Sequence, residues 1–446
     1  MISMQEKRDI WLKAFREHQD LMEGRVKRDI ETYRKGDCTL RFTDQNGAPL
    51  AGQTVTVCQQ THAFKFGANI FMLDEFENAE DNAKYREFFK KYFNLATVPF
   101  YWRGLEPEQG KPRYAKDSPK EYRRPAPDLC MEYCEQNGVA AKLHCLFYER
   151  HLPDWLPKDD ADAMIALYHK RFKEIADRYT GRMMEMEVIN ETLREFLWKC
   201  QTVLSKRRDV VEFAFDLARR YFPNETLVIN ETNPLGELAS QDYRSRFFMQ
   251  IEKCLLNGAS IDKIGLQHHI MPGPGTKTEE EFEREIRRAV DVNPKNILKG
   301  LDLLAEFGLP IEFTEVTVPT FGDTPEDEEL QAELLRLLYT VWFSHPSVNT
   351  IVYWNTVDGY CYDDGNWNEN KCRGGLFRHD LSPKKSAQTL WKLMNEEWHT
   401  ELTLTTDENG CVQFRGFYGD YTAALGDANV SLSVAVDGDN EFTFTV

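Results

Sequence analysis

The segment MMEMEVINE (183–191), the stretch VVEFAFDLARRYF (210–222) and the segment ETLVINETN (225–233) decide the fold. The first and third are short apolar runs typical of buried strands, and the middle one repeats its apolar residues with helical spacing. A strand, a helix and a second strand in this order predict a unit with two parallel, neighbouring strands. Both strands end on an Asn-Glu pair, at 190–191 and at 230–231.

The same alternation extends in both directions along the chain. Eight strand-like runs separated by helical patterns over about 330 residues are typical of a (β/α)8 TIM barrel, an α/β fold. A doubly wound open sheet is the alternative, but the chain has neither a GxGxxG nor a Walker loop to support it. The other six runs are 64–70, 94–102, 139–147, 263–270, 310–318 and 349–357.

The two ends of the chain have a different character. Residues 1–36 form a charged, helical pattern, and 38–57 consists of two alternating apolar segments around an Asn-Gly turn, which predicts a hairpin. Residues 400–446 also alternate with period two. We expect these ends to form one small β-sandwich. The expected units are a helix at 1–36, a sandwich of 37–62 plus 400–446, and a barrel at 63–399.

Composition excludes several classes of protein. The 446 residues carry 55 Lys and Arg against 73 Asp and Glu, a net charge of -18, which argues against a nucleic-acid partner. No stretch approaches the roughly 18 uncharged apolar residues of a membrane span, and the N-terminus lacks the apolar region of a secretory signal. Ten cysteines without a CxxC pair predict reduced thiols, and hence a cytoplasmic location.

Polar residues gather where the predicted strands end, which in such a barrel is where catalytic groups lie. Glu191 ends the fourth strand and Glu315 falls at the end of the seventh. Two carboxylates facing a sugar can split a glycosidic bond, with retention at a separation of about 5–5.5 Å and inversion at about 6.5–9.5 Å. A strand-end glutamate can equally be a solvated rim charge. Neither a metal motif such as HExxH nor a GxSxG elbow is present, so we expect no metal and no cofactor.

Several of these segments, taken in order, resemble glycoside hydrolase family 10, the xylanase family of clan A, over roughly residues 38–400. Glu-Val-Ile-Asn-Glu (187–191) resembles the family's acid/base segment W-D-V-V-N-E, and Ile-Glu-Phe-Thr-Glu-Val (311–316) its nucleophile segment I-T-E-L-D. Residues 265–269 resemble G-x-Q-x-H, and 229–233 resemble I-N-D-Y-N. Trp102 with Glu106, Pro107 and Gly110, and His144 with Pro153 and Trp155, keep the spacing of two further motifs.

This resemblance implies a role for each matching residue. Glu191 would be the general acid/base and Glu315 the nucleophile, with His269 orienting Glu315. Asn190 would hold the 2-hydroxyl of the sugar in subsite −1. Further substrate contacts are expected from Gln267, His144, Trp354 and Trp102, and from Tyr101, Tyr148 and Tyr362 at positions where the chain departs from the family.

The departures lie in the subsites that grip xylose. Tyr101 and Val98 replace a lysine and an asparagine, Tyr148 and Glu149 replace Trp-His, and Leu152 replaces a glutamine. Tyr362 stands where the family has a second tryptophan of the eighth strand. The resemblance therefore implies intact catalytic groups beside a rebuilt glycone site.

The expected function is retaining hydrolysis of β-linked glycans, endo-β-1,4-xylanase-like, on xylan-derived or other hemicellulosic oligosaccharides. One alternative is a β-glycosidase for a hexose-containing or decorated glycan. Another is a carbohydrate-binding barrel without activity, which the joint presence of Asn190, Glu191, Gln267, His269 and Glu315 argues against.

Overall fold

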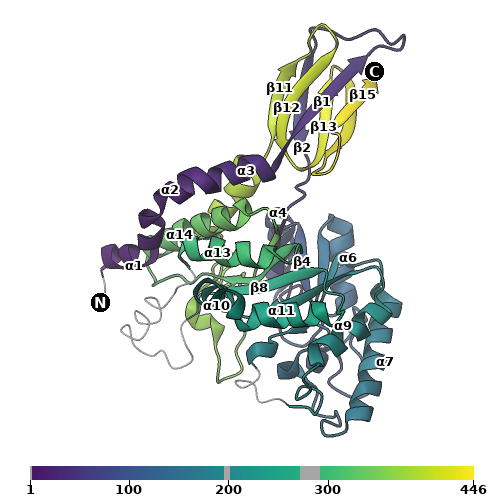
Figure 1. Cartoon of the computed structure of the whole chain (residues 1–446), viewed down its shortest axis with the longest axis vertical. Coiled ribbons are helices and arrows are strands. Elements are labelled where there is room, and N and C mark those ends of the chain that lie inside the picture. Colours follow the sequence, from purple (N-terminus) through teal and green to yellow (C-terminus); the bar gives the residue numbers. More distant parts are fainter. Residues whose placement is uncertain (1–2, 195–200, 272–291) are drawn as a thin grey trace.

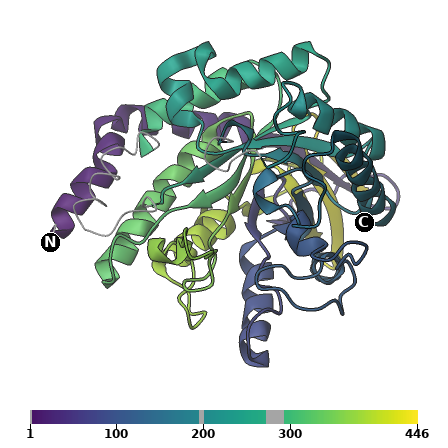
Figure 2. The ribbon, with the colours of Figure 1, turned by 90° about the horizontal axis from the view of Figure 1, so that it is seen from below.

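Eight parallel strands close into a barrel at the centre of the computed structural model, which describes residues 3–194, 201–271 and 292–446. The strand order β10-β3-β4-β5-β6-β7-β8-β9 follows the sequence around the barrel, and helices surround the strands (Figure 1 and Figure 2). The barrel prediction is thus confirmed, and each of the eight predicted runs contains one strand, except that β10 begins one residue before its run, at Val348. The strands are β3 (Lys65–Asn69), β4 (Leu95–Pro99), β5 (Ala140–His144), β6 (Glu185–Asn190), β7 (Thr226–Glu231), β8 (Lys263–His269), β9 (Ile311–Thr317) and β10 (Val348–Tyr353).

The helices between the strands bury one face each against the barrel. In α9 the buried residues include Val211, Ala214, Phe215 and Ala218, which recur at helical spacing as the sequence pattern predicted. The barrel helices are α4 (Ala79–Tyr92), α5 (Trp102–Leu105), α6 (Pro127–Asn137), α7 (Ala161–Tyr179), α9 (Val210–Tyr221), α10 (Leu235–Gln241), α11 (Arg246–Leu256), α13 (Pro294–Ala305), α14 (Pro325–Ser344) and α15 (Lys385–Lys392).

Charged side chains, rather than apolar ones alone, fill part of the barrel interior. Lys142 of β5 contacts Glu312 of β9 and lies 2.8 Å from Oε1 of Glu187. Lys263 lies 2.7 Å from Glu185 and 3.0 Å from Glu312. All five side chains are at most 3% exposed. The contacts of Lys142 with Glu312 and of Lys263 with Glu185 join strands that are not neighbours, so they cross the interior. Buried charges of this kind are tolerated because each has an opposite partner.

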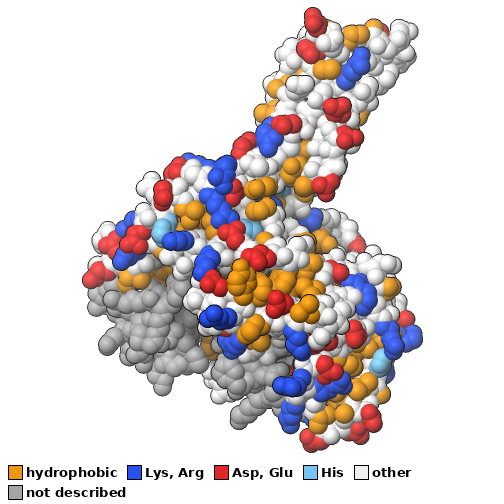
Figure 3. All heavy atoms as spheres, viewed as in Figure 1, with side chains coloured by type: hydrophobic (Ala, Val, Ile, Leu, Met, Phe, Trp, Pro, Cys, Tyr) orange, Lys and Arg blue, Asp and Glu red, His pale blue; other side chains and the backbone are white. Residues whose placement is uncertain are grey.

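The predicted N-terminal helix is a nearly continuous arm of α1 (Met4–Glu17), α2 (Gln19–Leu21) and α3 (Lys27–Tyr33), with a π-helical turn at Met22–Val26. Trp11, Leu12 and Phe15 bury its inner face, while basic and acidic side chains cover the outer face (Figure 3). Arg34, just after α3, donates to the carbonyls of Phe343 and Val348 at the end of α14 and the start of β10. The arm is thereby tied to the barrel.

Both chain ends contribute to a small β-sandwich that projects from the barrel (Figure 1). One sheet has the order β12-β1-β15 and the other β11-β2-β13-β14. Cys38, Leu40, Phe42, Val55 and Val57 are among the residues buried between them. The strands are β1 (Lys35–Thr43), β2 (Thr54–Gln59), β11 (Glu401–Thr405), β12 (Cys411–Phe417), β13 (Gly419–Leu425), β14 (Ala428–Val434) and β15 (Glu441–Thr445).

The predicted hairpin at 38–57 is wrong, because β1 and β2 lie in opposite sheets. The turn itself forms, with Gly47 at φ 82° and a hydrogen bond from the Asp44 amide to the Ala48 carbonyl. A single bridge, Thr43 to Pro49, follows it before the chain crosses to the other sheet. Pro49 has no N–H with which to continue a ladder. The local turn signal therefore marks a crossover between sheets.

Candidate active site

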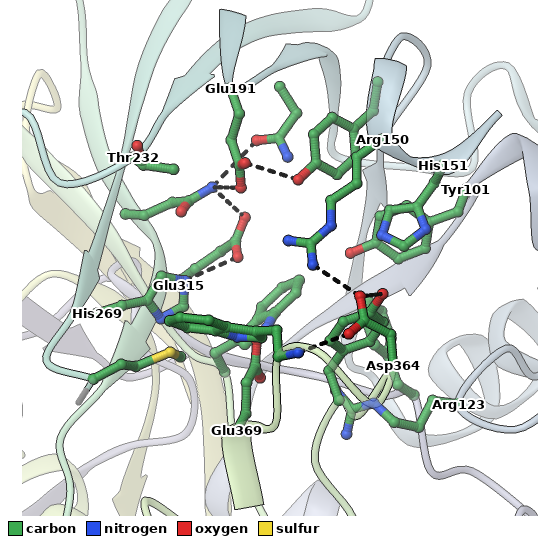
Figure 4. Close-up of a pocket in the computed structure, with 18 of the residues that line it drawn as sticks. Tyr101, Arg123, Arg150, His151, Glu191, Thr232, His269, Glu315, Asp364 and Glu369 are labelled. Carbon is green, nitrogen blue, oxygen red and sulfur yellow. Dashed lines mark hydrogen bonds and ion pairs between the residues drawn. The ribbon is translucent and has the colours of Figure 1, made fainter. Parts of the chain in front are cut away.

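The carboxyl ends of the barrel strands surround a cavity of about 750 Å³. Figure 4 shows Glu191 and Glu315 on one side of it and Arg150, Tyr101 and His151 on the other. Nine of the eleven residues predicted from the sequence line the cavity: Tyr101, Tyr148, Asn190, Glu191, Gln267, His269, Glu315, Trp354 and Tyr362.

Irregularities in two strands aim the polar residues into the cavity. The register of β8 with β9 passes from Leu266–Phe313 to Gln267–Glu315, so Thr314 is an extra residue on β9. This extra residue reverses the alternation of β9: Glu312 points inward below it, and Glu315 points inward above it. In β6 the extra residue is Val188, and it brings Asn190 opposite Asn230 of β7.

The amide nitrogen of Gln267 joins the two candidate catalytic carboxylates. Nε2 lies 3.1 Å from Oε1 of Glu191 and 2.9 Å from Oε1 of Glu315. Because both oxygens contact one atom, they are at most about 6 Å apart. Inversion needs about 6.5–9.5 Å between carboxyl groups to admit a water, so this separation fits a retaining pair.

Glu315 is 4% exposed and accepts hydrogen bonds on both carboxylate oxygens. Asn230 donates to Oε1 at 3.2 Å, in addition to Gln267, and His269 lies 3.1 Å from Oε2. Burial nevertheless raises the pKa of Glu315 well above its ordinary value. The charge of His144 opposes this rise, and the charges of Glu187, Glu191 and Glu369 add to it. The surroundings thus orient the carboxylate more than they favour its ionised form.

His269 contacts a different side chain with each ring nitrogen: Nε2 lies 3.1 Å from Glu315 Oε2, and Nδ1 lies 3.1 Å from the Thr317 hydroxyl. Once Glu315 is ionised, as it must be to attack, it only accepts, so Nε2 donates to it and Nδ1 accepts from the Thr317 hydroxyl. Burial lowers the pKa of His269, which favours the neutral ring, and the two hydrogen bonds then select the tautomer. His269 is therefore built to hold Glu315 in place.

Glu191 directly follows β6 and has the left-handed backbone φ of 57°, rare for a residue with a side chain. Its amide donates to the Asn230 carbonyl at 3.1 Å, which holds this conformation. The hydroxyl of Tyr148 donates to Oε2 at 2.8 Å, while Gln267 donates to Oε1. Backbone and side chain together place the Glu191 carboxylate above Glu315.

His144 does not line the cavity, because Tyr101 covers it. The histidine is 1% exposed, with Nδ1 on the Glu187 carboxylate and Nε2 2.8 Å from the Tyr101 hydroxyl. Burial disfavours the charged ring, but the Glu187 carboxylate more than offsets this and raises the pKa of His144. When the ring is protonated it donates from both nitrogens, and the Tyr101 hydroxyl, which then accepts from Nε2, keeps its own proton free for a substrate.

Trp102 and Glu149 also lie away from the cavity lining. The ring of Trp102, in α5, is 3% exposed, donates to Glu106 at 3.0 Å and packs on Trp155 and Tyr168. The structure thus gives Trp102 a packing role rather than a substrate contact. Glu149 accepts from the amides of Gln201 and Thr202 and anchors that segment.

Several residues of the lining had no sequence prediction. They lie in loops and short 3-10 turns, which carry no periodic pattern, and three of them are arginines. These residues include Arg123, Arg124, Arg150, His151, Asn233, Asp364 and Glu369. Asn233 belongs to the segment 229–233, which resembles a family motif, but it had no predicted role. Its side-chain amide donates to the His269 carbonyl and accepts from the His269 N–H. No signal of spacing or alternation pointed to the arginines.

Within the described ranges, two sets of three side chains bring possible metal ligands within 4.8 Å of one another. His144, Glu187 and Glu315 form one set, but their ligand atoms already bond to one another and to Lys142, Gln267 and His269. Cys58, His399 and Glu401 form the other, at the base of the sandwich. The cysteines of the described residues are free thiols. None of the helices described is long and apolar enough to cross a membrane.

Comparison with known proteins gives a consistent picture. The sequence profile of "Glycosyl hydrolase family 10" matches residues 59–392. The anti-sigma-I factor RsgI6 of Acetivibrio thermocellus is 26% identical over 94% of this chain and 47% of its own length. Endo-1,4-beta-xylanase 1 of Arabidopsis thaliana is 25% identical over 90% of this chain and 37% of its own length. The chain thus spans less than half of these relatives.

Solved structures share the barrel. The crystal structure of native xylanase 10B from Thermotoga maritima aligns with a TM-score of 0.60 and 20% identity, over 75% of this chain and 96% of that chain. Xylanase 10B from Thermotoga petrophila, solved with xylobiose, aligns with a TM-score of 0.59 and 22% identity, covering 75% and 95% of the two chains. At this identity the likeness concerns the fold.

Proposed function

The chain belongs to glycosyl hydrolase family 10, and we propose that it hydrolyses β-linked glycans with retention of configuration, as an endo-1,4-β-xylanase-like enzyme. One observation carries the proposal. A single amide, that of Gln267, holds one oxygen of Glu191 and one of Glu315 within about 6 Å of each other, which is below the roughly 6.5–9.5 Å of inverting pairs. The substrate proposed is a xylan-derived or other hemicellulosic oligosaccharide.

In the first step Glu315 attacks the anomeric carbon while Glu191 gives its proton to the glycosidic oxygen. The bond from the anomeric carbon to that oxygen breaks, the alcohol leaves, and a glycosyl ester on Glu315 remains. In the second step Glu191, now ionised, takes a proton from water, and the hydroxide displaces Glu315. The two displacements restore the original configuration and both carboxyl groups.

The side chains around the pair have matching tasks. His269 and Asn230 hold Glu315 in line, and Asn190 lies where it can bond the 2-hydroxyl, as in the family resemblance. Tyr148 fixes the Glu191 carboxyl. Trp354 lines the cavity, packed edge-on against Phe71 and His144, and offers a flat face to a sugar ring.

Specificity differs from that of a xylanase with the usual glycone residues. Tyr362 lines the cavity where the family has tryptophan, and its hydroxyl donates to Asp364 at 3.0 Å. Val98 is buried in the core and offers no hydrogen bond. These features favour the second candidate, a β-glycosidase for a hexose-containing or decorated glycan, over an enzyme for plain xylan.

A product analysis tests the proposal. Incubation with a panel of β-glycans, followed by NMR of the freshly released sugar before mutarotation, should show the β-anomer from a β-linked substrate. Kinetics on linear xylooligosaccharides and on β-gluco-, β-galacto- and decorated oligosaccharides rank the substrates. Release of the α-anomer contradicts retention. A marked preference for plain xylotetraose contradicts the rebuilt glycone site.

A further inference from the structure

Three guanidinium groups line the half of the cavity that faces away from Glu315. We call Arg123, Arg124 and Arg150 the arginine cluster. Arg123 and Arg124 precede α6, and Arg150 lies in the 3-10 turn Glu149–His151. In Figure 4 Arg150 extends across the cavity between Glu191 and Asp364, and Arg123 lies at its lower edge. The arginine cluster is unexpected in a chain with a net charge of -18.

Two of these arginines have no carboxylate partner in the described part of the chain. Arg123 is 4% exposed; it donates to the Tyr360 carbonyl, and its Nε is buried without an acceptor. Arg124 donates to the Arg123 carbonyl, 2.8 Å away. Both guanidinium groups lie over aromatic rings: Arg123 is 5.5 Å from the centre of Phe71, and Arg124 is 4.1 Å from that of Tyr101.

This arrangement is costly without an anion. A buried charge is tolerated when an opposite charge and hydrogen bonds surround it, and two neighbouring guanidinium groups also repel each other. Cation–π contacts compensate only in part, with about 0.5–2 kcal/mol each. The five ionic side chains of the barrel interior are paired with one another, whereas Arg123 and Arg124 face the cavity unpaired. The missing charge is one that a ligand can bring.

Arg150 forms an ion pair with Asp364 that it can exchange for one with a ligand. Asp364 lies 3.2 Å from its Nη2, but it also accepts from the Tyr362 hydroxyl and from the amides of Asn366 and Trp367, at 2.8–3.0 Å. The Asp364 carboxylate therefore keeps three donors if Arg150 turns to a ligand. Such donors compensate a carboxylate that loses one ion pair.

The cluster is close enough to the catalytic pair to contact a sugar bound there. Tyr148 donates to Glu191, its ring lies 6.2 Å from that of Tyr101, and Arg124 lies on Tyr101. Two aromatic side chains thus separate Arg124 from the Glu191 carboxylate. A glycan whose sugar is bound at Glu191 can therefore reach Arg124 with a substituent of that sugar or of the sugar in the adjoining subsite.

We propose that the arginine cluster binds an oxyanion substituent of the glycan, the carboxylate of a uronic acid or a sulfate ester, so that the preferred substrates are acidic β-glycans. The planar donors of guanidinium match both oxyanions with paired hydrogen bonds. This inference rests on the proposed function, since it names the class of glycan that the same cavity accepts.

Matched oligosaccharides test it. The first pair is a xylooligosaccharide with one glucuronic acid branch and the same molecule with its carboxyl reduced to a hydroxymethyl group. The second pair is a sulfated oligosaccharide and its desulfated form. We expect kcat/KM of the wild-type enzyme to be at least tenfold higher for the acidic member of one pair, and that pair identifies the oxyanion. Equal values within both pairs overturn the proposal.

Variants test whether the arginine cluster causes the preference for the acidic oligosaccharide. Arg124→Gln should lower the acidic-to-neutral ratio at least tenfold, and Arg124→Lys, which keeps the charge but not the planar donors, should lower it less. Arg336→Gln, which removes an equal charge from the exposed face of α14, should leave the ratio within twofold. An unchanged ratio in the folded Arg124→Gln protein places any anion elsewhere and overturns the proposal.

Failure of the proposed function has a different signature. If the wild-type protein hydrolyses none of these compounds, the catalytic proposal fails, and calorimetric titration with the same pairs still decides the anion site. Binding at least tenfold tighter for an acidic member, abolished by Arg124→Gln, supports the site. Equal affinities within both pairs overturn it.

Discussion

The hydroxyl of Tyr101 lies 2.8 Å from Nε2 of His144, and Tyr101 lines the cavity whereas the histidine does not. His144, from which the family resemblance implies a substrate contact, is thus joined to the cavity by a tyrosine that stands where the family has lysine. A lysine would add a charge at this point. The tyrosine adds an aromatic surface and a hydroxyl polarised by the His144–Glu187 pair.

Replacing Tyr101 by phenylalanine tests this relay, because it removes one hydroxyl and keeps the ring that packs on Arg124. A lost hydrogen bond to substrate costs about 1–3 kcal/mol, so we expect kcat/KM to fall about tenfold or more. Steady-state kinetics measure it, with Tyr243→Phe on the exposed surface as the control. A value within twofold of wild type removes Tyr101 from the reaction.

Substitution of either catalytic carboxyl should abolish most hydrolysis while the fold persists. Azide then separates the two roles: it should give Glu191→Ala a β-azide product, and Glu315→Ala or Glu315→Gly an α-azide. The stereochemistry differs because azide replaces the second nucleophile in one case and the first in the other. Mass spectrometry and NMR of the products decide. Turnover near wild type in either variant contradicts the assignment.

The barrel was predictable from the sequence because each of its strands is a buried apolar run next to a helical pattern. The partners of the terminal strands were not predictable. The turn at Asn46–Gly47 predicts a hairpin, yet β1 pairs with β12 and β15, which lie more than 360 residues away in the sequence. Which sheet a strand joins depends on packing between distant segments, and no local signal encodes it.

The positions of the strand-end residues were also predictable, and their exact directions were not. Thr314 and Val188 are bulge residues that set which neighbours point into the cavity, and nothing in their sequence distinguishes them from regular strand residues. Trp102 adjoins Tyr101, but α5 begins there and turns its ring into the core. The arginine cluster lies on loops, where periodicity gives no information.

The ion network inside the barrel should be essential for stability. Lys142→Met leaves the buried carboxylates of Glu187 and Glu312 without their shared ammonium group. Breaking such a pair costs about 3–5 kcal/mol. Denaturant unfolding measures the loss, and Lys173→Met, which breaks an exposed pair with Asp177, should cost below about 1 kcal/mol. Adding Glu312→Gln to Lys142→Met should recover part of the loss. Equal costs for Lys142→Met and Lys173→Met contradict this account.

Glu369 should influence the pH dependence of activity. Burial raises the pKa of Glu315, and the nearby charge of Glu369 contributes to the rise. Glu315 must be ionised to attack, so kcat/KM falls as the pH drops through this raised pKa. Glu369→Gln removes the negative charge, lowers the pKa of Glu315 and moves the acidic limb to lower pH. A pH profile of kcat/KM measures the shift, and a limb that stays in place or moves upward contradicts it.

The same carboxyl should make the folded protein less stable as the pH rises. In the folded state the pKa of Glu315 is well above its ordinary value of 4.5, because burial favours the neutral form. Below the ordinary value both the folded and the unfolded chain hold the proton, so the ionisation of Glu315 does not change the free energy of unfolding there. As the pH rises the unfolded chain loses its proton first, and stability decreases until the folded pKa is passed.

Glu315→Gln removes this penalty and keeps the shape of the side chain. Each unit of pKa difference is worth about 1.4 kcal/mol, so the variant should melt at a higher temperature than wild type at pH 7–8. The difference should shrink steadily toward pH 4.5, which makes the low-pH measurement an internal control. Thermal unfolding followed by circular dichroism across this range measures it. A difference in melting temperature that is constant with pH would indicate a packing effect, and one that reverses sign would show that the site favours the ionised carboxylate in the folded state.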